Sequence, residues 1–264
     1  MKKFFNVILW PLIFIFGQFF IENIFVSIFN SRNIDIYRKL FPNFTDIEII
    51  SNARYKTDLL NYINSKALIM TLISFIIFGL IFLVLIKRYK KNSVNFNLKN
   101  IIFIIILALS ISIFYNTFIY LINNNIHITD NYNKSDISII ILILTTGIMG
   151  PILEELLFRG IVYNRLLTFV NHKKAIILTS LLFSIMHMPD IITVIYTFLL
   201  SIIMIYLYNK FKTIKASIIF HIFINITIIF LVNLLILNNI IVNVILFILS
   251  MVMMLISLKK INLI

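Results

Sequence analysis

Apolar runs of around 20 residues recur from one end of this 264-residue chain to the other. A helix needs about 20 such residues to cross the hydrocarbon core of a bilayer, where its backbone polar groups must be satisfied within the segment. Hydrophobic residues make up 61% of the chain and charged residues 12%, a balance typical of integral membrane proteins. The sequence therefore predicts an all-α polytopic membrane protein with about eight transmembrane helices.

The net charge of +13 comes from Lys and Arg in short loops between the apolar runs, as in cytoplasmic loops. The basic stretch 87–91, the pair Lys173 and Lys174, and the pair Lys259 and Lys260 are expected inside the cell, which places both chain termini in the cytoplasm. No basic face is interleaved with stacking aromatics, so we do not expect nucleic-acid binding. The absence of Cys excludes disulfides, thiolate metal sites and a Cys nucleophile.

The expected spans divide the chain into an N-terminal part of three helices, residues 1–136, and a five-helix catalytic part, residues 137–264. The first span is expected to be retained, because it is too long for a signal-peptide core and no small-residue cleavage site follows it. Glu22 in this span is interpreted as a wetted or hydrogen-bonded carboxylate near its outer end, in preference to a catalytic residue. The expected spans are 4–29, 66–86, 101–122, 137–157, 175–188, 191–208, 216–237 and 240–258.

Residues 30–66 form the one sizeable polar segment and are expected outside the cell, with a turn at Pro42 and Asn43. Their apolar residues predict either short amphipathic helices on the membrane surface or a loop without a function of its own. In the fourth span, Gly147 and the pair Gly150-Pro151 predict a break just before Glu154. A new helical piece is expected to run on from there through Arg165.

Two adjacent acids and an arginine interrupt this apolar background, and charged groups at membrane depth are costly. Glu155 and Arg159 are four residues apart, so they share a helix face and can pair. Glu154 lies about 100° around the helix from Glu155. One carboxylate can therefore be tied to the arginine while its neighbour points elsewhere and takes a different role.

Two histidines also fall within apolar spans. His187 is expected about 12 residues, or about 18 Å, into its span, with Phe183 one turn earlier on the same face. His221 and Asn225 are four apart and share a face of the seventh span. We expect these side chains to meet Glu154 at one depth, somewhat inside the cytoplasmic interface.

A carboxylate base, two imidazoles and an amide together suit hydrolysis by an activated water. The same groups could hold zinc, but we favour a site without a metal or other cofactor, because the chain has no His-x-x-x-His or His-Glu-x-x-His pair. Each histidine alone could instead bond a backbone carbonyl, and the Glu-Arg pair could be a helix clamp. The remaining histidines, His127 and His172, fall in loops and are interpreted as ordinary.

Three motifs resemble the signature of the CPBP family of CAAX-protease and bacteriocin-processing intramembrane proteases, also called the Abi family and related to Rce-type prenyl-protein endopeptidases. The resemblance covers roughly residues 137–230 and rests on Glu154-Glu155-x-x-x-Arg159, Phe183-x-x-x-His187 and His221-x-x-x-Asn225.

This resemblance implies an eight-helix endopeptidase with a cytoplasm-facing cavity. Glu154 would be the general base on water and His187 would help to position that water. His221 and Asn225 would stabilise the oxyanion, and Glu155 and Arg159 would support the site. Members of the family have been assigned both glutamic and zinc-dependent mechanisms, and we favour the glutamic type.

We therefore expect a hydrolase in a bacterial plasma membrane that cleaves a peptide or a membrane-associated protein. The family is associated with peptide maturation, bacteriocin processing and immunity, which is an argument from analogy. One alternative is a non-catalytic immunity or scaffold protein of the same fold that binds a peptide in its polar cavity. Another is a proton-coupled transporter, since buried Glu and His also relay protons, although no inverted repeat is present.

Overall fold

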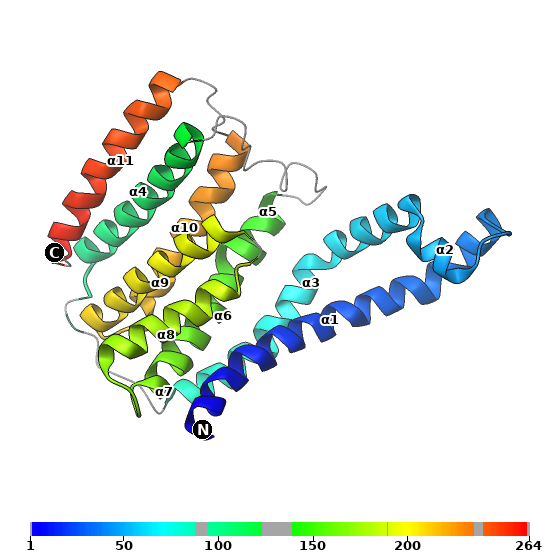
Figure 1. The fold of residues 1–264 in the computed structure, drawn as a ribbon, viewed down its shortest axis with the longest axis horizontal. Helices are drawn as coiled ribbons and strands as arrows, with labels where there is room; N and C mark the ends of the chain where they lie inside the picture. The colour runs from blue at the N-terminus through cyan, green and yellow to red at the C-terminus, as the bar shows by residue number, and fades with distance from the viewer. Residues whose placement is uncertain are drawn as a thin grey trace.

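The computed structural model describes residues 2–87, 94, 96–122, 139–188, 190–234 and 240–262, and in these residues the chain is helical without strands (Figure 1). The prediction of an all-α polytopic membrane protein is confirmed. The helices in chain order are α1 (Lys2–Leu40), α2 (Asp46–Ser51), α3 (Ala53–Ile86), α4 (Leu98–Ile122), α5 (Ile139–Leu142), the π-helix η3 (Ile143–Met149), α6 (Gly150–Glu155), the π-helix η4 (Leu156–Tyr163), α7 (Asn164–Leu166), α8 (His172–Ile185), α9 (Ile191–Phe211), α10 (Ile214–Leu234) and α11 (Ile240–Lys260).

Within the described ranges, six helical segments are long and apolar enough to cross a bilayer, and Ile214–Phe230 of α10 is a shorter apolar stretch. Helix α8 has 14 residues, or about 21 Å at 1.5 Å per residue, which is less than the roughly 30 Å of a hydrocarbon core. The expected spans thus correspond to helices, but one of them is short. Several expectations lie outside the described residues: the basic residues 88–91, the loop 123–136 with His127, Pro189 of the expected turn, and the turn at Asn238 and Asn239.

The helices form a bundle from which the α1–α3 pair leans away (Figure 1). Helix α4 packs against α10 and α11, α9 packs against α8 and α10, and α1 pairs with α3. All eight residues of η4 are buried, Arg159 among them, so this segment is enclosed on every side. Both chain ends lie at the same end of the bundle in Figure 1; that this end faces the cytoplasm stays a prediction.

The expectation of short helices in residues 30–66 is confirmed only for α2, and its position on the membrane surface stays a prediction. Helix α1 continues to Leu40 and α3 begins at Ala53, so only α2 is short. The predicted turn lies at Pro42 and Asn43. Thr45 caps α2 with a reciprocal bond to Glu48, and the Asn52 side chain accepts from the Arg54 N–H at the start of α3. These caps end and restart the helices, whereas no signal at residue 30 ends α1.

The expected break before Glu154 is also absent, because the segment Ile139–Leu166 stays helical throughout. Instead, the segment changes its helix type twice. The short α-helix α6 stands between two π-helical stretches, η3 before it and η4 after it. Pro151 stands in the first turn of α6, where a missing N–H is tolerated. The wider π-helical turns therefore take up the disturbance that we expected to break the helix.

One carbonyl in this segment loses its helical donor as a result. The Gly150 N–H donates to the Thr145 carbonyl, one residue before its α-helical partner, and Pro151 has no N–H to offer. In an α-helix the Thr146 carbonyl would accept from the Gly150 N–H, and in a π-helix from the N–H of residue 151. Neither donor is available to it here. The Asn225 side chain of α10 donates to it instead, at 2.9 Å.

Candidate functional site

A buried ion pair forms the base of the site. The Arg159 Nη1 atom donates to Glu155 Oε1 at 2.7 Å, and both side chains are fully buried. This confirms the pairing expected from their spacing. On the other side, Arg159 Nη2 donates to the Ser201 hydroxyl of α9 at 2.9 Å. A guanidinium with several partners is the arrangement that makes an ion pair tolerable in a low-dielectric interior.

His221 adds a third member to this cluster. Its Nδ1 atom lies 3.0 Å from Glu155 Oε1. An ionised carboxylate can only accept, so the ring carries a proton on Nδ1 and directs Nε2 away from Glu155. Glu155 therefore receives hydrogen bonds from Arg159 and His221 and fixes the orientation of both.

His187 lies in the turn that follows α8, not within the helical span of residues 175–188 as expected. Helix α8 ends at Ile185, and the His187 N–H bonds the Ser184 carbonyl at 3.0 Å. The ring Nδ1 atom donates to the Phe183 carbonyl at 2.8 Å. As in His221, this bond places a proton on Nδ1 and leaves Nε2 to face the site.

Glu154 faces both histidines. Its Oε2 atom lies 3.8 Å from His187 Nε2 and 3.9 Å from His221 Nε2. These distances are too long for direct hydrogen bonds but suit a bridging water. Among the described residues, this buried oxygen has no hydrogen-bond partner. The Glu154 side chain as a whole is 25% exposed.

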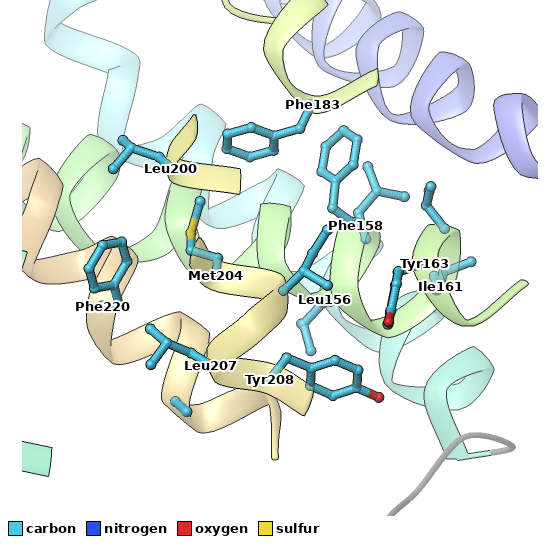
Figure 2. Close-up of a cluster of buried hydrophobic side chains, with 14 of the residues drawn as sticks. Leu156, Phe158, Ile161, Tyr163, Phe183, Leu200, Met204, Leu207, Tyr208 and Phe220 are labelled. Atoms are coloured by element: carbon cyan, nitrogen blue, oxygen red, sulfur yellow. The ribbon is translucent and has the colours of Figure 1, made fainter. Parts of the chain in front are cut away.

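The ring of Phe183 fills the space beneath these groups. The Arg159 guanidinium lies 4.7 Å from its centroid, and the rings of His187 and His221 lie 4.6 and 5.7 Å away. Phe158 packs edge-on against it at 5.1 Å (Figure 2). Phe183 thus holds the arginine and both imidazoles in fixed relation and keeps water from the buried ion pair.

Asn225 is one helical turn beyond His221, and one amide N–H is used on the Thr146 carbonyl. The amide nitrogen carries a second hydrogen that remains for a ligand. The structure thus brings Glu154, Glu155, Arg159, Phe183, His187 and His221 into contact and ties Asn225 to the π-helical segment beside them. Of the other histidines that the structure describes, His172 lies away from this group against Tyr163 and Asn209.

Sequence reasoning missed two contributions. Ser201, which binds Arg159, carries no signal in the sequence that separates it from other helical serines. The second contribution comes from α1, whose Gln18 and Glu22 line a cavity of about 330 Å³ together with Glu154 and His187. The exposed Glu22 side chain borders the same cavity as the site residues, and its wetting by solvent stays a prediction.

The donor types of the site would suit zinc, since both imidazoles have their Nδ1 protons bonded to an oxygen, as metal ligands usually do. Within the described ranges, however, no group of three or more His, Asp or Glu side chains is arranged to hold a metal ion. We therefore derive no chemical step through a metal.

A family model described as type II CAAX prenyl endopeptidase Rce1-like matches residues 136–227, a segment that holds all three motifs. A curated relative, the UPF0177 protein in abiGi 5'region of Lactococcus lactis subsp. cremoris, is 30% identical over 142 residues. That alignment covers 50% of this chain and 59% of the relative. No solved structure matches the chain. The resemblance to the CPBP and Abi family is thereby confirmed, and the chain is an integral membrane protein.

Proposed function

We propose that this protein is an intramembrane endopeptidase in which Glu154 activates a water molecule. The observation that carries the proposal is the buried Glu154 Oε2 atom, which faces two imidazole Nε2 atoms at 3.8 and 3.9 Å and has no partner among the described residues. The match to a peptidase family over the same residues supports it. The host membrane is proposed to be a bacterial plasma membrane, with the site open to the cytoplasm.

In the first step, a water held between Glu154 and His187 attacks the carbonyl carbon of the scissile peptide bond. Glu154 Oε2 accepts one proton of this water, and His187 Nε2 accepts a hydrogen bond from the other. When the tetrahedral intermediate collapses, the protonated Glu154 returns the proton to the leaving amine. The bond to the Phe183 carbonyl keeps the His187 ring in the tautomer that this step needs.

Oxyanion stabilisation falls to His221 and Asn225. A doubly protonated His221 donates through Nδ1 to Glu155 and through Nε2 to the developing oxyanion. Because Glu154 holds the water proton at this stage, the charges of Glu155, Arg159, His221 and the oxyanion sum to zero, which is the least costly state at membrane depth. The second amide hydrogen of Asn225 provides a further donor.

The test is cleavage of a library of short amphipathic peptides by purified wild-type protein and Glu154→Gln in detergent, read by mass spectrometry. Gln keeps the shape of Glu but cannot act as a base, so we expect cleavage to fall by at least about 100-fold, the lower end of the contribution of a general base. Asp35→Asn, which removes an exposed carboxylate of α1, is the control and should cleave like the wild type. Cleavage by Glu154→Gln at the wild-type rate would refute the proposal.

The same assay separates the alternatives. Cleavage that survives a strong zinc chelator supports the glutamic mechanism, whereas loss on chelation would assign the site to a metal. If neither protein cleaves any peptide but the wild type binds members of the library, the scaffold function replaces the peptidase. Maturation of small peptides, bacteriocin processing and immunity are the biological roles that we propose to examine in a deletion strain complemented with Glu154→Gln.

A further inference from the structure

One face of α1 forms a wall of the cavity that reaches the site. The α1 residues on this wall recur at helical spacing and run about 12 Å along the helix, given 1.5 Å per residue. Opposite them stand residues of the proposed catalytic centre and its apolar neighbours. The α1 wall consists of Phe14, Ile15, Gln18, Phe19 and Glu22, and the facing wall of Glu154, Phe158, Met186 and His187.

Glu22 is chemically out of place on this wall. It lies inside a candidate membrane span, Phe4–Leu40, where an ionised carboxylate is costly unless a partner balances it. The Glu22 side chain forms no hydrogen bond or ion pair with another residue that the structure describes. None of the described residues that line the cavity is a Lys or Arg, so none of them gives the carboxylate a cationic partner. Gln18, one turn earlier on the same face, adds an amide and no charge.

We propose that Glu22 binds a basic group of the peptide substrate, a Lys or Arg side chain near the scissile bond, and so determines specificity. This inference rests on the proposed peptidase function, because the same cavity contains Glu154 and His187. The aromatic and aliphatic lining accepts the apolar residues of the peptide around that cation. A cavity of about 330 Å³ is at the small end of ligand pockets, so it admits a few side chains and not a folded domain.

The experiment compares fluorogenic peptides that differ at one residue. That residue is Lys, the uncharged norleucine or Glu, and it is placed in turn at each position beside the cleaved bond. Wild-type kcat/KM should be about tenfold or more higher for Lys than for norleucine at one position, which corresponds to about 1.4 kcal/mol. Glu22→Gln should lose this preference and retain cleavage of the norleucine peptide. Glu22→Lys should prefer the Glu peptide. Asp35→Asn, which removes a carboxylate of the same helix away from the cavity, should keep the wild-type preference.

Binding of the same peptides to Glu154→Gln, measured by fluorescence anisotropy in detergent, separates this proposal from the proposed function. Tighter binding of the Lys peptide that is lost in Glu22→Gln/Glu154→Gln supports cation recognition even if the wild type cleaves nothing. Equal cleavage of the Lys and norleucine peptides by the wild type would overturn cation recognition and leave the peptidase function standing.

If Glu154→Gln binds the two peptides equally and the wild type cleaves neither, both cation recognition and the peptidase function are overturned. A Glu22-dependent affinity for vesicles of phosphatidylethanolamine, with no Lys preference among peptides, would assign the carboxylate to a lipid amine and overturn the peptide assignment.

Discussion

Ion pairs form two clusters among the residues that the structure describes, and the surroundings of the two clusters are opposite. In the bundle, Glu155 and Arg159 pair at 2.7 Å with both side chains fully buried. At the far end of the α1–α3 pair, Arg38 bonds Asp35 and Asp46 at similar distances, with side chains 51–71% exposed. Both arginines use short helical spacing to reach an acid. The comparison teaches that distance alone does not give the energetic importance of an ion pair. When one partner is lost, a buried pair leaves an uncompensated charge in the interior, whereas an exposed pair leaves a charge in solvent.

The largest expected effect comes from removing each arginine. Arg159→Leu leaves Glu155 buried without its counter-charge, which should cost about 3–5 kcal/mol of unfolding free energy. Arg38→Leu leaves its acids in solvent and should change stability little. Thermal unfolding of both variants in detergent checks this difference. Equal loss of stability in the two variants would show that the buried pair is no more important than the exposed one.

A second substitution tests how closely the buried cluster is enclosed. A Cβ at Gly160 of η4 would overlap the side chain of Ile86, whereas a Cβ at Gly79 of α3 would lie 3.7 Å from Leu153, an ordinary contact. Gly160→Ala should therefore cost about 1–3 kcal/mol by overpacking. Gly79→Ala should be neutral or stabilising, because Ala favours the helix. Unfolding in detergent measures both, and a stable Gly160→Ala would mean that α3 is not tightly held against η4.

The bond between Asn225 and the Thr146 carbonyl gives a third, smaller test. Asn225→Ala leaves this carbonyl without the side-chain donor and should cost about 1–3 kcal/mol of stability. In a Pro151→Ala background the restored N–H can serve the same carbonyl, so the cost of Asn225→Ala should shrink. A double-mutant cycle on unfolding free energies measures the coupling between Asn225→Ala and Pro151→Ala. Additive effects would mean that the proline is not the reason the amide is needed.

The smallest effect is expected from pH at the exposed cluster. The hydrogen bond from Arg38 holds the pKa of Asp46 below its ordinary 3.8, and bonds from Thr45 lower the pKa of Glu48. Depressed pKa values mean that these bonds stabilise α2 fully above the ordinary pKa and lose that effect as the pH falls through the lowered one. An environment-sensitive dye on Ser51→Cys, the one thiol in a chain without Cys, should report loosening of α2 below about pH 4. The same dye on Ser51→Cys/Asp46→Asn should show a smaller change.

The sequence predicted the polar centre well, because charged and polar residues are rare enough in this chain for their spacing to be informative. The i,i+4 spacing of Glu155 and Arg159 predicted their contact, and the three motifs predicted which side chains surround Glu154. The roles of these residues in catalysis stay predictions. The helices themselves were readable because apolar runs of membrane length leave few other structures open.

The apolar background hid the rest. Where nearly every residue is apolar, hydrophobic periodicity cannot distinguish α-helical from π-helical turns, so η3 and η4 were missed. For the same reason no apolar stripe showed which face of α1 turns toward Glu154. The sequence therefore did not predict that Glu22 lines the cavity beside Glu154. The end of α8 at Ile185 was also hidden, since the apolar run continues to Met188.

The short α8 has a consequence for the membrane itself. Helix α8, which is followed by the turn that holds His187, is about 21 Å long and about 9 Å shorter than an average hydrocarbon core, so a bilayer that it crosses would be mismatched there. Lipids next to such a helix compress, or headgroups and water follow its end inward. The reacting water would then come from a local dimple in the bilayer, and the thickness of the host membrane would become a control on the chemistry at Glu154.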